Sequence, residues 1–148
     1  MSRVLITGIT GQDGAYLANY LLSQGDEIYG LAPRRSSDSQ WRLRELGIEN
    51  EITFLPGDMT DPSSLSEVIA LAEPNEIYNL AAQSFVATSW TQPQLTSNVN
   101  FLGPLTILDL VRRSDHEIRF YQASTSEMFG LIQDPKQNEK TPFYPRSP

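Results

Sequence analysis

The sequence predicts a fold of the α/β class, with a parallel sheet covered by helices on both faces. Short apolar runs bounded by turn residues alternate with helical patterns along the 148 residues. The first apolar run, residues 4–7, leads directly into three glycines spaced three apart and then into a helical pattern. Such alternation imposes right-handed crossovers and therefore a parallel sheet. With a dinucleotide-type turn after the first strand, we expect a Rossmann-type, doubly wound sheet of order 3-2-1-4-5 in one domain, residues 1–148.

The individual elements follow from local pattern. The strands are expected in short apolar runs at residues 4–7, 27–32, 52–56, 76–80 and 118–123. The helices are expected where apolar residues recur at helical spacing, at residues 14–23, 39–46, 61–72 and 95–113. Asp61 or Ser63 can cap the third helix. Residues 133–148 are polar and proline-rich, which predicts a loop, so we expect the sheet to be truncated on its C-terminal side.

Composition limits the classes of partner and location. The chain has 11 Lys and Arg against 18 Asp and Glu, a net charge of −7, which argues against general binding to nucleic acid or to an anionic membrane. It has no cysteine, so it has no disulfide and no thiolate metal site. No stretch has the length and apolarity of a signal peptide or a membrane span. We therefore expect a cytoplasmic protein.

The glycine turn is the strongest functional motif. Gly8, Gly11 and Gly14 lie between a strand and a helix, which is the context that a phosphate-binding turn requires. Such a turn lets the backbone approach a pyrophosphate, and the helix N-terminus supplies free N–H donors. The alternative is a turn that only packs the strand on the helix.

The end of the second strand distinguishes NAD from NADP. An NAD enzyme usually places a carboxylate there to accept hydrogen bonds from the ribose. This chain instead has Arg34, Arg35 and Ser36, whose guanidinium and hydroxyl groups suit a 2′-phosphate. We therefore predict NADP as the cofactor. The alternative is a solvated basic loop without a partner.

Two further segments follow strands and would face the same ligand. Asp58, after the third strand, can accept a hydrogen bond from the adenine amine or can cap the next helix. Residues 80–84, LAAQS, close the fourth strand with small side chains that would let a cofactor cross the strand ends. Ordinary close packing explains the small residues equally well.

The candidate catalytic segment is ASTSEMFG, residues 123–130, which follows the fifth strand. It therefore emerges at the carboxyl edge of the sheet, where open α/β folds keep their sites. Ser124, Thr125 and Ser126 offer hydroxyl groups, and Glu127 is a candidate proton carrier that the next two residues, Met and Phe, would shield. The residues alone favour the alternative, a serine-rich loop with a solvated glutamate.

Several motifs together resemble a known family. The glycine turn, residues 80–84, NFLG at 100–103 and the Ser/Thr segment after the fifth strand resemble the extended short-chain dehydrogenase/reductase superfamily. GITGQDG, RRSS and FYQASTSEMFG followed by TPFYPRSP narrow this resemblance to the GDP-mannose 4,6-dehydratase family. It covers essentially the whole chain. Pro33, Phe85 and Pro104 depart from the family pattern without touching the implied reacting groups.

The resemblance implies the roles of individual residues. It assigns no metal ligand, and it implies that Thr125 hydrogen-bonds the sugar 4-oxygen, that Glu127 is the acid–base residue and that Ser126 assists. The residues that it implies for NADP are Gly8, Thr10, Gly11, Gln12, Asp13 and Gly14 at the pyrophosphate, Arg34, Arg35 and Ser36 at the 2′-phosphate, Asp58 and Met59 at the adenine, and Leu80, Ala81, Ala82, Gln83 and Ser84 at the nicotinamide half.

The implied activity is dehydration of GDP-mannose to GDP-4-keto-6-deoxy-mannose through transient oxidation at C4, a step towards GDP-fucose or GDP-rhamnose. The family's catalytic Tyr and Lys, spaced YxxxK, would follow Pro148, so we interpret the chain as the N-terminal part of a longer, homo-oligomeric enzyme, a dimer or tetramer, that has little activity alone. One alternative is a nucleotide-sugar epimerase or a 4-keto-hexose reductase of the same superfamily. Another is a non-catalytic NADP-binding module.

Overall fold

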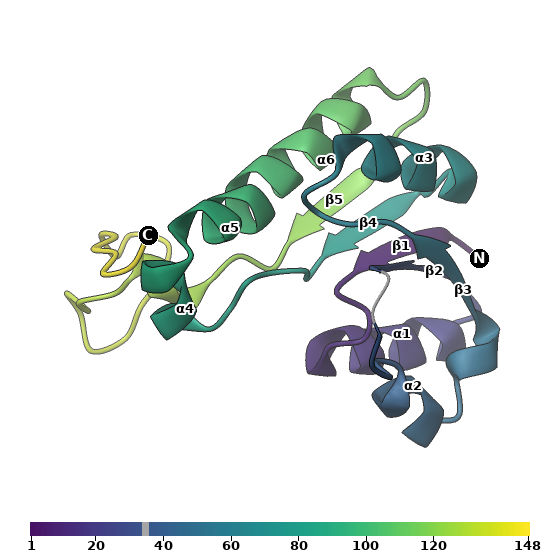
Figure 1. Cartoon of the computed structure of the whole chain (residues 1–148), viewed down its shortest axis with the longest axis horizontal. Helices are drawn as coiled ribbons and strands as arrows, with labels where there is room; N and C mark the ends of the chain where they lie inside the picture. The colour runs from purple at the N-terminus through teal and green to yellow at the C-terminus, as the bar shows by residue number, and fades with distance from the viewer. Residues whose placement is uncertain (34–35) are drawn as a thin grey trace.

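The computed structural model, which describes residues 1–33 and 36–148, is built on a five-stranded sheet of order β3-β2-β1-β4-β5 (Figure 1). Every neighbouring pair of strands is parallel, as the sequence predicts. The strands are β1 (Arg3–Thr7), β2 (Glu27–Ala32), β3 (Ile52–Pro56), β4 (Glu76–Asn79) and β5 (Arg119–Gln122).

Helices cover both faces of this sheet, which confirms the doubly wound fold (Figure 1). On one face, β1 packs through Val4 and Ile6 against α1 (Gln12–Ser23) and α2 (Trp41–Glu45). On the other face, Leu5 lies in the apolar cluster that includes α3 (Pro62–Ala72) and α6 (Gly103–Arg113). The central strand is therefore buried from both sides, which explains its continuous apolar run.

The register brings the carboxyl ends of three strands together. Thr7, the last residue of β1, is aligned with Asn79, the last residue of β4. Asn79 is in turn aligned with Gln122, the last residue of β5. The chain segments that leave these three strands therefore start at one level, and the functional residues are placed by this edge.

One predicted helix cap is confirmed in detail. Asp61 is the N-cap of α3, and its side chain accepts a hydrogen bond of 3.0 Å from the Ser63 backbone N–H. Pro62 occupies the first helical position, where the missing N–H of proline is no loss. Asp61 and not Ser63 thus starts the helix.

The helical region between β4 and β5 differs from the prediction. The expected helix 95–113 is divided into α5 (Pro93–Ser97), a π-helical turn (Asn98–Leu102) and α6. Pro104, near the start of α6, has no N–H to donate to the preceding turn, which is consistent with the wider turn before it. An additional short helix, α4 (Val86–Thr91), was not predicted.

The remaining differences are small. The predicted helix 39–46 is reduced to α2, and the ends of several strands shift by one residue. The described residues 133–148 contain no helix or strand, as expected for a loop.

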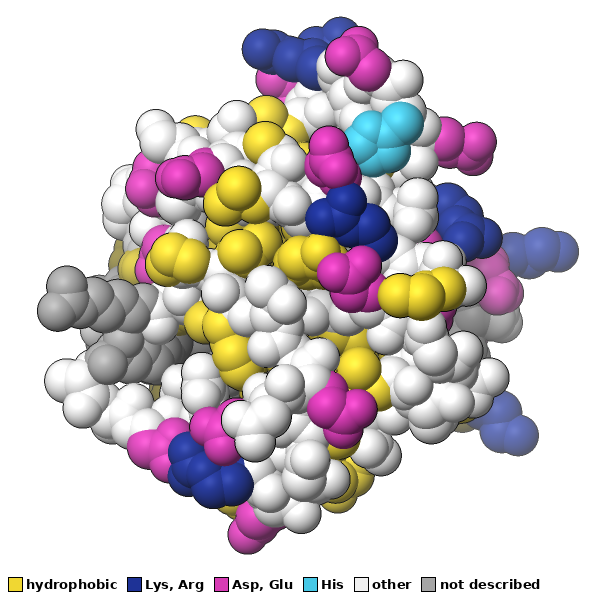
Figure 2. All heavy atoms as spheres, turned by 90° about the vertical axis from the view of Figure 1, so that its right-hand side faces the viewer, with side chains coloured by type: hydrophobic (Ala, Val, Ile, Leu, Met, Phe, Trp, Pro, Cys, Tyr) yellow, Lys and Arg dark blue, Asp and Glu magenta, His cyan; other side chains and the backbone are white. Residues whose placement is uncertain are grey.

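Among the helices that the structure describes, none is long and apolar enough to cross a membrane. Figure 2 shows acidic and basic side chains interspersed on one face of the molecule. Among the described ion pairs, Arg3 pairs with Glu27 and Glu73.

Candidate active site

The turn after β1 is built for close backbone approach. Gly8 has a φ of +69°, and a Cβ at this position would lie 2.7 Å from the backbone nitrogen of Ala81. A Cβ at Gly14 would overlap the backbone oxygen of Gly8. Only glycine therefore fits at both positions, because the turn touches the segment after β4 on one side and the start of α1 on the other.

Helix α1 begins at this turn with its N-terminus open. Gly11 is the N-cap in an extended conformation, and it provides no side-chain cap for the first turn of the helix. Its own N–H donates to the oxygen of Gly8 at 2.9 Å, which closes the turn. Because no side chain caps the start of α1, the backbone N–H groups of its first turn remain available to an anion. The glycines beside this helix start leave the space that such an anion would need.

A buried polar chain links the ends of β1, β4 and β5. The Thr7 hydroxyl donates to the Asn79 side-chain oxygen at 2.5 Å and accepts from the backbone N–H of Ala81 at 3.1 Å. The Asn79 amide then donates to the Gln122 side-chain oxygen at 2.7 Å. Because Thr7 and Asn79 are buried, this chain fixes how the strand ends sit relative to one another. Sequence reasoning did not identify it.

The structure of the segment after β3 bears on the two roles that the sequence left open for Asp58, namely a contact to the adenine and the cap of the next helix. Asp58 does not cap α3, since Asp61 does. Its Oδ1 instead accepts from the backbone N–H and the hydroxyl of Thr60, at 2.8 and 2.7 Å, and the residue is exposed. The Met59 side chain is buried against Gly103 in the core, so only main-chain atoms of Met59 could reach a ligand.

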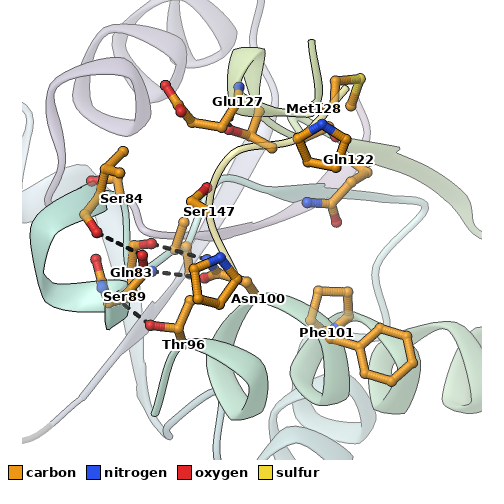
Figure 3. A pocket seen from close by; sticks show the side chains of 18 of the residues that line it. Gln83, Ser84, Ser89, Thr96, Asn100, Phe101, Gln122, Glu127, Met128 and Ser147 are labelled. Atoms are coloured by element: carbon orange, nitrogen blue, oxygen red, sulfur yellow. Dashed lines mark hydrogen bonds between the residues drawn. The ribbon is translucent and has the colours of Figure 1, made fainter. Parts of the chain in front are cut away.

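A cavity of about 660 Å³ lies at the carboxyl edge (Figure 3). It brings the predicted nicotinamide residues Ala81, Ala82, Gln83 and Ser84 to the same space as the catalytic candidates Thr125 and Glu127. The other sides are formed by α4, α5, the π-helical turn and α6, together with Pro145, Ser147 and Pro148 of the C-terminal loop. Of the remaining candidates, Leu80, Ser126, Asp58 and the glycine turn do not line this cavity.

The segment that leaves β4 is held by side chains of the following helices. The backbone N–H of Gln83 donates to the Asn100 side-chain oxygen at 2.8 Å, and the Asn100 amide donates back to the Gln83 oxygen at 2.9 Å. The Gln83 amide also donates to the Thr96 hydroxyl at 3.2 Å (Figure 3). Asn100 lies in the π-helical turn, so this irregular turn positions one wall of the cavity.

The candidate catalytic segment, residues 123–130, forms a compact turn after β5. Ser124 has a φ of +60°, a strained conformation for a residue with a side chain. The Thr125 side-chain oxygen accepts from the backbone N–H of Glu127 at 3.1 Å and starts a 3₁₀ turn (Ser126–Met128). Since this oxygen already accepts one bond, the hydroxyl proton of Thr125 is available to donate.

The expectation that the neighbouring apolar residues shield Glu127 is wrong. Glu127 is exposed, and Figure 3 shows it across the cavity from Gln83 and Asn100. The Phe129 ring instead packs on Phe143, with ring centroids 5.2 Å apart. Phe129 thus fastens the C-terminal loop and does not cover the carboxylate.

The predicted 2′-phosphate site is described only in part. Arg34 and Arg35 lie outside the described residues. Ser36, which follows them, is exposed. The structure brings the neighbouring glycine turn and α2 together, through a hydrogen bond from Arg42 to the Thr10 carbonyl oxygen.

The strand order, the glycine turn and the cavity at the carboxyl edge define a Rossmann-type protein of the doubly wound class. The profile of the family described as GDP-mannose 4,6 dehydratase matches residues 5–148. The chain belongs to the GDP-mannose 4,6-dehydratase family, as its sequence motifs predict.

Named relatives agree with this assignment. The chain is 48% identical to the GDP-mannose 4,6-dehydratase of Yersinia enterocolitica, over 100% of this chain and 42% of the relative. It is 45% identical to the human GDP-mannose 4,6 dehydratase, over 97% of this chain and 41% of the relative. The chain thus spans about 40% of the length of the curated relatives it matches.

Solved structures show the same architecture. The Thermus thermophilus UDP-glucose 4-epimerase in complex with NAD matches with a TM-score of 0.82 and 26% identity, over 98% of this chain and 45% of that chain. A UDP-Glc/GlcNAc 4-epimerase from Campylobacter jejuni matches with a TM-score of 0.87 and 22% identity, over 99% of this chain and 44% of that chain, and supports the fold alone.

Proposed function

We propose that the protein containing this chain dehydrates GDP-mannose to GDP-4-keto-6-deoxy-mannose, with NADP as the bound cofactor. The observation that carries the proposal is the cavity in which the segment after β4 faces Thr125 and Glu127. Family membership supports the reaction class, and this juxtaposition supports the proposal that the reaction takes place in this cavity.

The residues present fit a dinucleotide. The space at Gly8 and Gly14 and the open start of α1 suit the pyrophosphate, and exposed Asp58 can accept from the adenine amine. The small residues Ala81 and Ala82 let a nicotinamide lie across the strand ends. When bound, the nicotinamide supplies the acceptor and donor of a hydride. The choice of NADP rests on Arg34, Arg35 and Ser36 in the sequence.

The catalytic roles are those that the family resemblance implies, and the cavity is compatible with those of Thr125 and Glu127. The Thr125 hydroxyl donates a hydrogen bond to the sugar 4-oxygen while its own oxygen accepts one from Glu127 N–H. Glu127 removes the C5 proton, which a 4-ketone acidifies, and returns a proton to the departing C6 hydroxyl. Ser126 assists from the same turn. The first oxidation also needs the Tyr and Lys of the superfamily, which we place outside this chain.

The test of this proposal is Glu127→Gln in the intact protein. Loss of the acid–base group should lower the rate of water elimination by about 10²- to 10⁴-fold. Oxidation at C4 should persist in this variant, and the absorbance of the reduced nicotinamide measures it. Glu139→Gln is the matched control, since Glu139 is exposed and does not line the cavity. Elimination at the wild-type rate in Glu127→Gln would show that the role belongs to another residue.

The cofactor proposal has its own test. Replacement of Arg34 and Arg35 by Ala should weaken NADP binding by roughly 2 to 4 kcal/mol, because charge-assisted hydrogen bonds to the 2′-phosphate are lost. NAD binding should hardly change, since NAD lacks that phosphate. Equal weakening of both cofactors would contradict the assignment.

A second candidate is an epimerase or a 4-keto-hexose reductase, which the likeness to the T. thermophilus epimerase favours. Neither reaction eliminates water, so neither needs a proton carrier for C5 and C6. Formation of the 4-keto-6-deoxy product from GDP-mannose by the intact protein separates these reactions from the dehydratase. A gene product that lacks the downstream Tyr and Lys would instead support a non-catalytic NADP-binding module.

A further inference from the structure

Arg42 differs from the other arginines of the described helices and strands. Each of those others forms an ion pair with a carboxylate, namely Arg3, Arg44, Arg112, Arg113 and Arg119. Arg42 has no such pair within the described part of the chain, which contains all of its Asp and Glu residues. In a protein of net charge −7, a cation without a carboxylate partner is a candidate for binding an anion.

The position of Arg42 is fixed by two contacts. One guanidinium nitrogen donates to the Thr10 carbonyl oxygen in the glycine turn at 3.2 Å. The guanidinium carbon lies 4.2 Å from the centroid of the Trp41 ring. Stacking on the indole ring holds the planar guanidinium in place. Its remaining N–H donors lie in the guanidinium plane and stay available to a ligand. The side chain is also half-buried, so its cation is presented at a defined place.

The site belongs to the edge that would hold the adenosine half of a dinucleotide. Thr10 follows β1, and α2 is the first helix after β2, so Arg42 joins the two segments between which the adenine ribose lies in this fold. A second cavity, of about 290 Å³, lies beside it and is lined by Gln12, Tyr16, Arg42 and Glu45 among others.

We propose that Arg42 is a ligand of the cofactor's 2′-phosphate and therefore a determinant of selectivity for NADP over NAD. The proposal rests on the proposed use of NADP, and it names a residue beyond the RRSS segment. The pyrophosphate is the less favoured target, because Arg42 is carried by the helix that follows β2, where the ribose is read. Trp41 and the Thr10 carbonyl oxygen preset its orientation.

The experiment measures dissociation constants of NADPH and NADH by fluorescence titration of the intact protein. Arg42→Gln should weaken NADPH about 10- to 100-fold, the effect of losing a charge-assisted hydrogen bond, and should change NADH by less than about two-fold. Arg42→Lys should recover part of the loss, because it restores the charge without the planar fork. Arg44→Gln is the matched control, since Arg44 lies two residues away on α2 and pairs with Asp38 and Glu49.

Each other outcome overturns the proposal. Equal weakening of NADPH and NADH in Arg42→Gln would mean that Arg42 supports the glycine turn or the pyrophosphate. Unchanged binding of both would mean that the cation is only solvated. If Arg42→Gln does not fold, Arg42→Lys decides, because Lys lacks the planar fork of Arg: a loss of NADPH affinity no larger than the loss of NADH affinity would overturn the proposal. A wild-type protein that does not prefer NADPH would refute the proposed cofactor instead, before any variant is measured.

Discussion

The two sides of the carboxyl edge are built differently. At the glycine turn, four of the five residues of β1 are buried, and Gly8 touches the segment after β4 through backbone atoms. At the candidate catalytic segment, no residue of β5 is fully buried, and Thr125 and Glu127 are exposed. The first region is shaped by core packing, and the second is held by its own hydrogen bonds. Substitutions in the first region should therefore lower the free energy of unfolding. Substitutions in the second region should leave the free energy of unfolding largely unchanged.

The largest effect should come from Gly8→Ala. The new Cβ would meet the backbone of Leu80 and Ala81 in a residue with positive φ, so we expect the free energy of unfolding to fall by about 4 kcal/mol. Gly25→Ala is the control, because Gly25 also has positive φ but has no atom within 4 Å of the Cβ position, and we expect a loss of about 1 kcal/mol there. Urea denaturation of the intact protein measures both. Similar losses would show that φ strain, and not the close approach, governs the turn.

A pair of neighbours on α6 should give the next largest effect. Ile107 is 0% exposed and Leu108 is 45% exposed. Ile107→Ala should lower the free energy of unfolding by about 3 kcal/mol because it leaves a cavity, and Leu108→Ala by less than about 1 kcal/mol. Thermal and urea unfolding check the difference. A large loss at Leu108 would mean that this face is covered in the intact protein.

The polar chain between the strand ends should contribute less. Asn79→Leu leaves the Thr7 hydroxyl and the Gln122 side-chain oxygen without their partner, so we expect a loss of about 2 kcal/mol in the free energy of unfolding. Gln122→Leu removes only the exposed end of the chain and should have roughly half that effect. If the two variants unfold at the same denaturant concentration, the three strand ends are not coupled as described.

The smallest effect concerns acid pH. The Arg112 hydrogen bond lowers the pKa of Asp109 in α6, and the Arg44 hydrogen bond lowers the pKa of Asp38 before α2. A carboxyl whose pKa is lower in the folded state contributes stability above its unfolded pKa of about 4, and this contribution is lost as the pH falls further. Asp109→Asn and Asp38→Asn should each slightly reduce the fall in Tm on acidification. Since both pairs are on the surface, an effect as large as that of Ile107→Ala would contradict this view.

Much of the fold could be predicted because its information is local. The strands, their order and the Asp61 cap follow from short patterns and from general rules of chain crossover. Helix α4 was missed because VATSWT is rich in β-branched and small residues and begins without a side-chain cap. The π-helical turn was missed because apolar periodicity runs through it.

The site was predictable where motifs are contiguous and not where it depends on register. The glycine turn and the segment 123–130 are continuous in sequence, and the structure places both at the expected edge. The partners Thr7 and Asn79 are 72 residues apart, and Asn79 and Gln122 are 43 apart, so their contacts exist only once the strands are aligned. The exposure of Glu127 was not predicted, because the sequence does not show that Phe129 packs on Phe143 in the C-terminal loop.

Several contacts join the turn that carries Glu127 to the C-terminal loop, so the two segments cannot move independently. Besides the two aromatic rings, the backbone N–H of Tyr144 donates to the Met128 oxygen at 3.1 Å, and the Leu131 N–H donates to the Tyr144 oxygen at 3.0 Å. Pro145, Ser147 and Pro148, which follow Tyr144 in this loop, line the cavity. The candidate proton carrier Glu127 and part of the cavity rim are thus connected through the same contacts, so a displacement of the C-terminal loop would also displace the turn that carries this carboxylate.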